Sequence, residues 1–324
     1  MPKLDKLVRE LCSDGVQVFR LEEIAHYAKT RIDCKTINED NYVGVENLLQ
    51  NKAGKTKATS VPTTGMVIAY QKNDILIGNI RPYLRKVWLA DCEGGTNGDV
   101  LTVQIKDTEK VLPQFLYYVL SSEKFFLYDI QNSKGAKMPR GSKDAVMKFE
   151  IPLPPIEVQR EIVRILDNFT NLTAELTAEL TARKTQYAYY RDNLLTTKPQ
   201  WNHVKILDML SQPITDGPHT TPQFVQNGVP FISVDSIWDG KIHFEKRRGY
   251  ITEEFDEECC KKYKPQKNDV YMVKSGSTTG KVAFVDTDIR FNIWSPLAAM
   301  RVNEKNSARF LFYLLQTERV QKQV

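Results

Sequence analysis

Residues 151–194 read IPLPPIEVQREIVRILDNFTNLTAELTAELTARKTQYAYYRDNL, and this stretch predicts how the chain is built. After the Ile-Pro-Leu-Pro-Pro run it contains no further proline or glycine, and apolar residues recur mostly three or four positions apart. The spacing predicts one long amphipathic helix of the coiled-coil type from about Glu157 to Leu194, spanning roughly 57 Å at about 1.5 Å per residue. Its apolar seam consists of Ile162, Ile165, Phe169, Leu172, Leu176, Leu180, Tyr187, Tyr190 and Leu194.

Such a helix is either a core helix of a bundle or a rod that separates domains. The chain of 324 residues is long enough for two domains, and its 41% apolar and 26% charged residues are typical of a globular protein. No apolar run approaches about 18 residues and the start lacks a signal sequence, so we expect a cytoplasmic protein without a membrane span.

The charge and the cysteine and histidine content indicate which partners, compartment and metal sites to expect. The net charge of +5 permits a nucleic-acid partner, and the basic excess lies in residues 1–150 and 201–324, because residues 151–200 carry equal numbers of acidic and basic side chains. The five cysteines are odd in number and form no Cys-x-x-Cys, which favours free thiols in a reducing compartment. The four histidines lack the spacing of zinc ligands, so we expect no metal site.

An internal repeat is the strongest signal outside the helix. Gln71-Lys-Asn-Asp74 recurs as Gln266-Lys-Asn-Asp269, 195 positions further on, and the segments 115–120 and 310–315 match at the same offset. A common offset over about fifty positions does not arise by chance. We therefore predict two copies of one domain, in residues 1–150 and 201–324, with the long helix in residues 151–200 between them.

Each copy has the pattern of a small α+β domain. Short runs rich in Val, Ile and Tyr, bounded by Gly, Asn and Asp, predict strands, and an amphipathic helix follows them in each copy, at 113–126 and 308–322. The predicted strands are Tyr42 to Leu48, Met66 to Tyr70, Asp74 to Gly78 and Val87 to Ala90 in the first copy, and Pro230 to Val234, Asp269 to Val273 and Val282 to Val285 in the second.

Two motifs suggest a nucleotide-binding loop and a catalytic histidine, but neither has the residues that such a site requires. Ser275-Gly-Ser-Thr-Thr-Gly-Lys281 lacks the first glycine of a phosphate loop, and Val282 stands where that loop needs Ser or Thr. Asp216-Gly-Pro-His219 is turn chemistry, and no nucleophile accompanies the histidine. No Gly-x-Ser-x-Gly, dinucleotide glycine fingerprint or Asn-Pro-Pro-aromatic methyltransferase motif occurs. We therefore expect no catalytic residues in this chain.

Basic side chains among glycines, prolines and aromatics are candidates for contacts with DNA phosphates and base edges. The alternatives are a solvated surface loop for the segment 129–143 and a plain turn for 275–281. The candidates are Lys134, Lys137, Arg140 and Lys143 in the first loop, Arg81, Tyr83, Arg85 and Lys86 near it in sequence, and His219, Lys274, Ser277, Thr278 and Lys281 in the second copy.

The ordered combination resembles the specificity subunit of type I restriction–modification systems. The features that carry the resemblance are a recognition block, the hinge Ile151 to Gln159, the Leu-Thr-Ala-Glu repeats inside the helix, and a second block with Asp216-Gly-x-His219-x-Thr-Pro222 and Ser275-Gly-Ser-Thr-Thr-Gly280. The resemblance covers essentially the whole chain.

The resemblance implies a non-catalytic DNA reader with two target-recognition domains separated by a coiled-coil helix. Each domain would read one half of a bipartite site in the double helix, chiefly in the major groove. Two long helices would pack antiparallel along their seams and fix the distance between the half-sites. They would also dock two adenine methyltransferase subunits, which use S-adenosylmethionine, and a restriction subunit that uses ATP and Mg²⁺ would join the assembly. This chain itself would hold no cofactor.

The chain departs from the family pattern at its end, because Val324 aligns with residue 129 and a second hinge and helix would begin at about residue 346. We therefore expect a second chain, as a homodimer or a complementing fragment, to supply the missing helix. The alternatives are a silent truncated gene product, a scaffold of two binding modules that does not bind DNA, and a stand-alone nuclease or methyltransferase.

Overall fold

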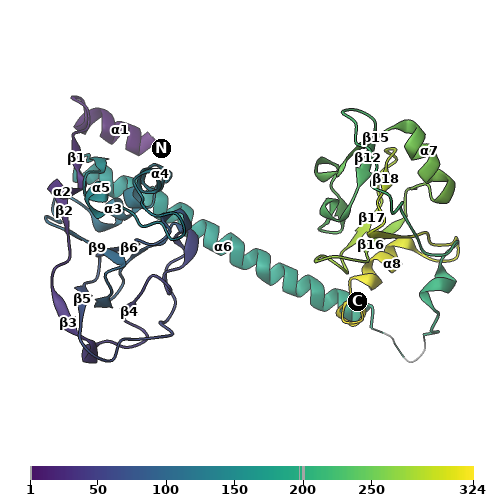
Figure 1. The fold of residues 1–324 in the computed structure, drawn as a ribbon, viewed down its shortest axis with the longest axis horizontal. Helices are drawn as coiled ribbons and strands as arrows, with labels where there is room; N and C mark the ends of the chain where they lie inside the picture. Colours follow the sequence, from purple (N-terminus) through teal and green to yellow (C-terminus); the bar gives the residue numbers. More distant parts are fainter. Residues whose placement is uncertain (1, 197, 199–200) are drawn as a thin grey trace. The chain divides into compact units, whose positions relative to one another are not determined.

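The computed structural model describes residues 2–196, 198 and 201–324, and these divide into two compact units. Unit 1 comprises Met1–Leu176 and unit 2 comprises Thr177–Val324. The helix α6 (Ile156–Leu194) runs through the boundary, which confirms the long helix expected from the sequence (Figure 1). The predicted end of the helical segment at residue 200 lies outside the described residues.

Unit 1 is built around two four-stranded sheets, with strand orders β2-β9-β6-β7 and β3-β5-β8-β4. Neighbouring strands are antiparallel except β4 and β8, which are parallel. A separate antiparallel pair joins β1 to β10. The strands are β1 (Val18–Arg20), β2 (Ala25–Tyr27), β3 (Arg31–Asp33), β4 (Tyr42–Val43), β5 (Met66–Tyr70), β6 (Ile75–Gly78), β7 (Val87–Leu89), β8 (Gly94–Thr96), β9 (Val100–Ile105) and β10 (Glu150–Pro152).

The central strand β6 is buried on both faces, because successive side chains of a strand point to opposite sides of the sheet. Ile75 and Ile77 enter a core cluster with Leu116 and Phe125 of the helices, whereas Leu76 enters a second cluster with Tyr70 of the other sheet. The helices of unit 1 besides α6 are α1 (Pro2–Leu11), α2 (Leu21–Ile24), α3 (Pro113–Leu120), α4 (Glu123–Gln131) and α5 (Lys143–Met147).

The single helix predicted at 113–126 is wrong, because α3 ends at Leu120 and α4 begins at Glu123. The hydroxyl of Ser122 accepts a hydrogen bond from the backbone N–H of Phe125 and so caps a new helix. The helix predicted at 308–322 is also divided, into α8 (Ala308–Leu315) and α9 (Glu318–Gln321). Here the hydroxyl of Thr317, the N-cap of α9, donates to the carbonyl of Leu314 and does not cap the new helix. The apolar spacing continues across the break and therefore conceals it.

Unit 2 contains sheets with strand orders β11-β19-β16-β17 and β15-β12-β18, and a hairpin of β13 and β14. The helix α7 (Glu253–Lys262) packs near β18, and α8 packs near β16 and β17 (Figure 1). The strands are β11 (Thr215–Asp216), β12 (Val229–Ile232), β13 (Ile237–Trp238), β14 (Lys241–Ile242), β15 (Gly249–Ile251), β16 (Val270–Val273), β17 (Val282–Phe284), β18 (Asn292–Ile293) and β19 (Leu297–Met300).

The strand pairing confirms the internal repeat. Residue Ile75 of β6 pairs with Leu89, and Val270 of β16 pairs with Phe284, both shifted by 195 positions. A parallel contact in each unit is also equivalent, since β4 pairs with β8 as β12 pairs with β18. The two units are therefore copies of one α+β topology.

The predicted strands are correct in place, but most of them are longer than the strands in the structure. Tyr42 to Leu48 contains only the two residues of β4, because the Asn47 side chain accepts from the N–H of Gly44 and donates to the carbonyl of Tyr42, which closes a turn. The strands not predicted are β2, β3, β8, β9 and β10 in unit 1 and β11, β13, β14, β15, β18 and β19 in unit 2. They are short or lack alternation, so their partners in the sheet, rather than local sequence, define them.

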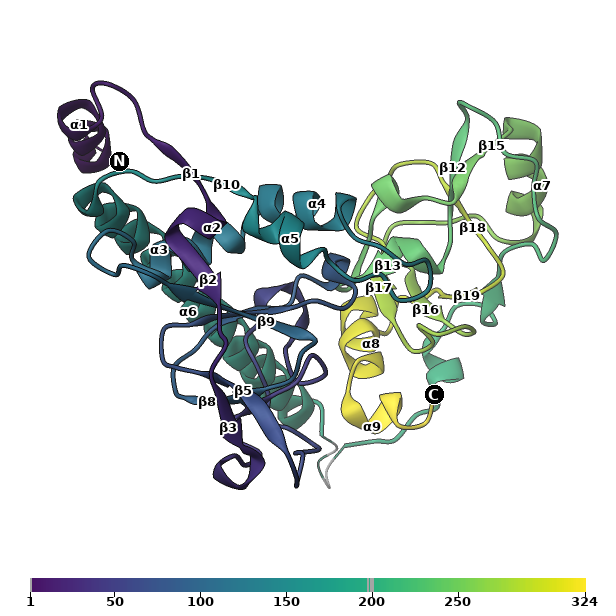
Figure 2. The same cartoon turned by 60° about the vertical axis from the view of Figure 1, so that its left-hand side comes forward.

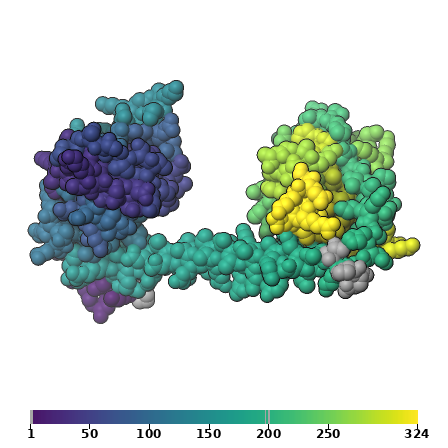
Figure 3. All heavy atoms as spheres, turned by 90° about the horizontal axis from the view of Figure 1, so that it is seen from below, coloured from purple at the N-terminus to yellow at the C-terminus, as the bar shows by residue number. Residues whose placement is uncertain are grey.

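The middle of α6 is bare, as Figure 3 shows. Ile162 and Ile165 are half-buried in unit 1, but every residue from 168 to 187 is exposed, including the seam residues Phe169 and Leu176 at 61% and 57% exposure. No helix among the residues that the structure describes has both the length and the apolarity to cross a bilayer.

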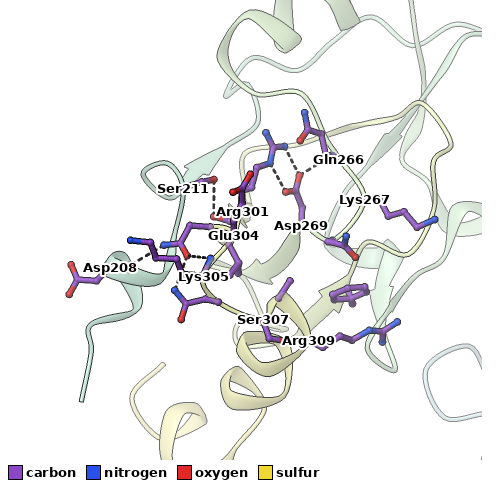
Figure 4. A pocket seen from close by; sticks show the side chains of 16 residues that line it. Asp208, Ser211, Gln266, Lys267, Asp269, Arg301, Glu304, Lys305, Ser307 and Arg309 are labelled. Atoms are coloured by element: carbon purple, nitrogen blue, oxygen red, sulfur yellow. Dashed lines mark hydrogen bonds and ion pairs between the residues drawn. The ribbon is translucent and has the colours of Figure 1, made fainter. Parts of the chain in front are cut away.

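A buried aspartate fixes the turn before the central strand in each unit. Asp74 accepts from the N–H of Gln71 and from the Gln104 side chain, each at 2.8 Å. In unit 2, Asp269 accepts a hydrogen bond from the N–H of Gln266 in the same way. Arg301 takes the place that Gln104 has in unit 1, and its guanidinium binds both carboxylate oxygens of Asp269 at 2.7 and 2.8 Å (Figure 4). The open cleft beside Asp269 and Arg301 is lined mostly by polar residues, and these two charged side chains neutralise each other.

We expect Arg301→Leu to lower the free energy of unfolding by about 3–5 kcal/mol, because Asp269 is 1% exposed and would lose its counter-charge. Arg301→Gln should cost about 1–2 kcal/mol, since the amide restores the donor that unit 1 uses. Denaturant unfolding of the two variants measures the difference. Equal losses in the two variants would contradict this, because they would show that the charge of Arg301 matters and its donor capacity matters little.

Candidate nucleic-acid interface

Two predicted contact segments of unit 1 lie side by side and are joined through their backbones. They are the β6–β7 loop, residues 79–86, and the α4–α5 loop, residues 132–142. The N–H of Arg81 donates to the carbonyl of Pro139 at 2.7 Å, and the N–H of Gly141 donates to the carbonyl of Asn79 at 3.1 Å. Lys134 and Arg140 exchange two further backbone hydrogen bonds at 2.9 Å, so the second loop is a closed hairpin rather than a loose tether.

Some side chains of these two loops are exposed to solvent, and others form hydrogen bonds or ion pairs within unit 1. Arg81, Lys134 and Lys137 are exposed, and none of them has an ion pair within the described part of the chain. Tyr83 is 49% exposed beside them in sequence. Arg140 is exposed and contacts Asp99 at 3.2 Å. Exposed cations next to an exposed aromatic ring suit phosphates and base edges.

Three other candidates of unit 1 are tied to the protein. Arg85 pairs with Glu123 at 2.5 Å. The ammonium of Lys86 donates to the carbonyl of Val45 at 2.6 Å, and burial lowers the pKa of Lys86. Lys143 lies in the first turn of α5, with its ammonium 3.4 Å from the carbonyl of Gly98. These residues shape the loops, and Lys86 points inward.

Backbone strain is concentrated in the same loop. Arg81 and Arg85 both have a φ of 53°, in the left-handed region that side-chain-bearing residues seldom adopt. They flank the short turn at Pro82–Leu84, which therefore projects Tyr83 outward. Such strain costs about 1 kcal/mol or more per residue and is commonly found at functional sites.

A buried carboxylate without a donor lies beneath the joined loops. Asp129, in α4, is 1% exposed, and neither of its oxygens has a hydrogen-bond partner among the described residues. The Oδ1 of Asn79 also has no hydrogen-bond partner among the described residues. A Cβ added at Gly141 would lie 2.4 Å from the Oδ1 of Asp129 and 2.8 Å from the Oδ1 of Asn79. Only glycine fits there. Burial raises the pKa of Asp129 to about 6.

The equivalent loop of unit 2, residues 274–281, is held by charge instead. Lys262 and Lys274 both form ion pairs with Asp216, and the Nε2 of His219 lies 3.4 Å from the same carboxylate. Burial opposes ionisation of Asp216, but the two lysines outweigh it and lower its pKa to about 2. The structure therefore brings His219 and Lys274 together.

Two further candidates of this loop, Ser277 and Lys281, are exposed. The Oγ1 of Thr278 is buried and has no hydrogen-bond partner within the described residues. The N–H of Lys274 donates to Pro296 at 2.9 Å, as that of Asn79 donates to Asp99 at 2.9 Å, so the two loops occupy the same position in the repeat. Contacts predicted separately in the two copies thus fall on equivalent loops.

Unit 2 also presents aromatic–cation contacts that the sequence pattern did not single out. Trp238, 43% exposed, stacks on His243 with ring centroids 4.2 Å apart, and the ammonium of Lys246 lies 5.1 Å from the Trp238 ring. Arg247 lies over the ring of Tyr250. The run Lys-Arg-Arg at 246–248 close to a tryptophan was the available signal.

The predicted helix interface is anchored at each end within its own unit. The hydroxyl of Tyr118 in α3 donates to Asp167 of α6 at 2.6 Å in unit 1. In unit 2 the carboxylate of Asp192 accepts from the N–H of Glu318, the first residue of α9, at 3.1 Å. Between these anchors the seam residues are exposed: Phe169, Leu172, Leu176, Leu180, Tyr187 and Tyr190, followed by Leu194 at the end of α6.

Comparison with known proteins identifies the family. The family model of the type I restriction modification DNA specificity domain matches residues 13–183, more than half of the chain. The chain therefore belongs to the type I restriction–modification specificity family.

Curated relatives agree with the family model. A putative type I specificity subunit of Haemophilus influenzae is 31% identical over 191 residues, 56% of this chain and 47% of that protein. A specificity subunit of Escherichia coli is 35% identical over 161 residues, 46% of this chain and 37% of that protein. The matched region thus spans less than half of these two relatives. The MjaVIII specificity subunit of Methanocaldococcus jannaschii is 23% identical and matches 95% of this chain and 76% of its own length.

Solved structures share the fold. The crystal structure of the S subunit from M. genitalium has a TM-score of 0.54 at 14% identity, covering 95% of this chain and 79% of the other. A chain from a structural study of complex assembly in a type I restriction–modification system has a TM-score of 0.56 at 20% identity, covering 95% and 81%. Both confirm two α+β domains separated by a long helix.

The buried Asp129 predicts a pH-dependent stability. Because its pKa is about 6 in the folded chain against an ordinary 3.8, the folded state holds the proton more tightly, and this contribution to stability is lost as the pH rises through about 6. Asp129→Asn should therefore raise the free energy of unfolding above pH 7 by roughly 1–3 kcal/mol and have little effect below pH ~5.

Unfolding of wild type and Asp129→Asn across pH 4.5–8.5 tests this. Asp91→Asn, at an exposed carboxylate, is the matched control and should follow the wild-type profile. A loss of stability in Asp129→Asn at pH 8 would contradict the prediction, because it would mean that the ionised carboxylate has a stabilising partner.

Proposed function

We propose that this chain is the DNA-reading, non-catalytic subunit of a type I restriction–modification complex. The observation that carries the proposal is the presence of exposed cationic or hydroxyl-bearing loops at equivalent positions of two repeated domains, residues 79–86 and 274–281, on a chain of the specificity family. Two copies of one reading surface suit a target composed of two half-sites.

In this proposal the side chains have different roles. Lys134, Lys137 and Arg140 of unit 1, and Lys281 of unit 2, contact phosphates and set the position on the duplex. Tyr83 with Arg81, and Ser277 with Thr278, reach base edges in the major groove, where all four base pairs are distinguishable. Lys274 and His219 are held by Asp216 and orient the second loop.

The bare part of α6 is the proposed docking surface for adenine methyltransferase subunits. Exposed leucines at positions 172, 176 and 180 form an apolar strip that is unusual on a solvated surface. The cofactors of the assembly, S-adenosylmethionine and, with a restriction subunit, ATP and Mg²⁺, would reside in those partners. A second chain, as a homodimer or a complementing fragment, is proposed to share the same seam.

Lysine removal tests the phosphate contacts. The double variant Lys134→Ala/Lys137→Ala should bind DNA more weakly, and the slope of log affinity against log salt should fall by about 2, since roughly 0.9 counterion is released per phosphate contact. The control Lys6→Ala/Lys110→Ala removes two exposed charges elsewhere in unit 1. Binding is measured with the methyltransferase partner present. An unchanged salt slope would remove these lysines from the interface.

A methylome tests the whole proposal. The chain is expressed with its adenine methyltransferase subunit in a host without adenine methylation, and modified adenines are sequenced. An asymmetric bipartite motif is expected, with one half altered by Ser277→Asn/Thr278→Asn. A palindromic motif insensitive to that change would mean that unit 1 alone reads DNA in a dimer. Absence of any DNA binding by the complex would favour a scaffold or a silent gene product.

A further inference from the structure

We propose that a cleft on unit 2, beside the loop 274–281, binds a single unpaired nucleotide by its base and its phosphate. The walls of the cleft are the β13–β14 hairpin, residues 279–282, the helix α8 and the last turns of α6. The hairpin and α8 both pack against β17 (Figure 2). The inference rests on the geometry of unit 2 alone and goes beyond the reading of a duplex.

The size and lining of the cleft suit a small ligand. Its volume is about 590 Å³, and clefts that hold small ligands measure about 300–1,000 Å³. The lining combines basic side chains with aromatic rings. A nucleotide requires this combination, because cations neutralise its phosphate and an aromatic ring stacks on its base.

Three basic side chains of the cleft are available to an anion. Lys241, Lys281 and Arg309 are exposed, and none of them forms an ion pair within the part of the chain that the structure describes. The guanidinium of Arg309 lies 3.9 Å from the ring centroid of Phe284. This contact holds the guanidinium at one edge of the cleft without neutralising its charge.

The acidic side chains of the cleft do not cancel this charge. Two carboxylates, those of Asp239 and Asp286, line the cleft together with four basic residues. The fourth basic residue, Arg191, is paired with Asp192 at 2.7 Å. A surplus of positive charge therefore remains, and it favours a phosphate.

Tyr313 of α8 supplies the stacking surface for the base. Its side chain is 37% exposed, and its hydroxyl makes no hydrogen bond within the described residues. The equivalent Tyr118 of unit 1 is instead tied to Asp167 by its hydroxyl at 2.6 Å. Trp238 also lines the cleft, but one face of its ring already stacks on His243. An exposed aromatic ring accepts any base, since every base has a π-face.

The loop of unit 1 carries a side chain where the loop of unit 2 has none. Arg85 stands at the position of Gly280, 195 residues earlier, and its guanidinium reaches Glu123 at the start of α4. Gly280 lines the cleft, and its carbonyl accepts from the amide of Gln321 at 2.8 Å. The glycine therefore leaves open the space into which Arg85 extends in unit 1.

The basic residues of the cleft are also particular to unit 2. Lys86, the equivalent of Lys281, donates to the carbonyl of Val45 and is not available. Gln114 stands at the position of Arg309. A surface used alike by both repeats would not require these differences, and we therefore assign the cleft a ligand of its own.

The probe is deoxyadenylate, the nucleoside monophosphate, titrated into the full chain by calorimetry. Deoxyadenosine and inorganic phosphate serve as its two halves. Saturable binding of one deoxyadenylate per chain is expected, at least tenfold tighter than the binding of either half. Inorganic phosphate that binds as tightly as the nucleotide would overturn the proposal, because the cleft would then recognise only an anion. Absence of saturable binding would overturn it as well.

Two variants separate the contributions of charge and stacking. Arg309→Gln, which copies the residue of unit 1, should weaken the binding of deoxyadenylate at least tenfold. Tyr313→Leu should weaken deoxyadenylate at least fivefold and leave the affinity for inorganic phosphate unchanged, because phosphate does not stack. Lys264→Gln removes an exposed charge outside the lining of the cleft and is the matched control.

Neither Arg309 nor Tyr313 has a role in the proposed reading of DNA, so these variants test the cleft separately from the proposed function. Near-ultraviolet circular dichroism verifies that both variants fold. Wild-type affinity for deoxyadenylate in folded Arg309→Gln would refute the proposal.

Competition identifies the source of the nucleotide. Displacement of deoxyadenylate by single-stranded oligodeoxyadenylate, with the same dependence on Arg309, would support an unpaired nucleotide of a DNA strand as the ligand. Deoxyadenylate that binds and that the strand cannot displace would support a free nucleotide. Displacement by an oligoglutamate of equal charge at the same concentration would overturn the proposal, because the cleft would then be a site for an acidic peptide.

Discussion

A buried carboxylate at the start of the central strand determines the geometry of both units. Asp74 and Asp269 each close a tight turn through their own backbone and accept a side-chain donor from the neighbouring strand. This double attachment fixes the register of β6 against β9 and of β16 against β19. Because β6 and β16 lead directly into the loops at 79–86 and 274–281, the same turn sets where the candidate contact surface lies.

The two units stabilise that loop by different means. In unit 1, backbone hydrogen bonds join the loop 79–86 to the hairpin 132–142. The same region contains Arg81 and Arg85 in the left-handed conformation, and the buried carboxylate of Asp129 without a hydrogen-bond donor. Unit 2 gathers two lysines and a histidine around Asp216. Strain and unsatisfied polar groups at one site, and concentrated charge at the other, are expected where a surface has been shaped for contact rather than for stability.

The long helix has the opposite character, being regular, neutral and largely uncovered. Its contacts with each unit are confined to its two ends, while the middle exposes aromatic and leucine side chains. An exposed apolar strip of this extent is typical of surfaces through which proteins associate.

The sequence by itself determined the long helix, the repeat and the family, because each depends on patterns that extend over many residues. Helical periodicity in 156–194 and a constant offset between Gln71 and Gln266 do not require knowledge of any contact. Basic residues in loops were also visible, and Arg81 and Lys134 do share one surface.

Only the tertiary structure decided which of those residues are available. Lys86 turns inward to a carbonyl, Lys274 is paired with Asp216, and Asp129 is buried without a donor, and none of this is encoded by local residue types. Strand β9 likewise depends on its pairing partners, and the break after α3 depends on the cap that Ser122 provides for α4. Such features arise from contacts between residues that are distant in the chain, whereas periodicity reports only on neighbours.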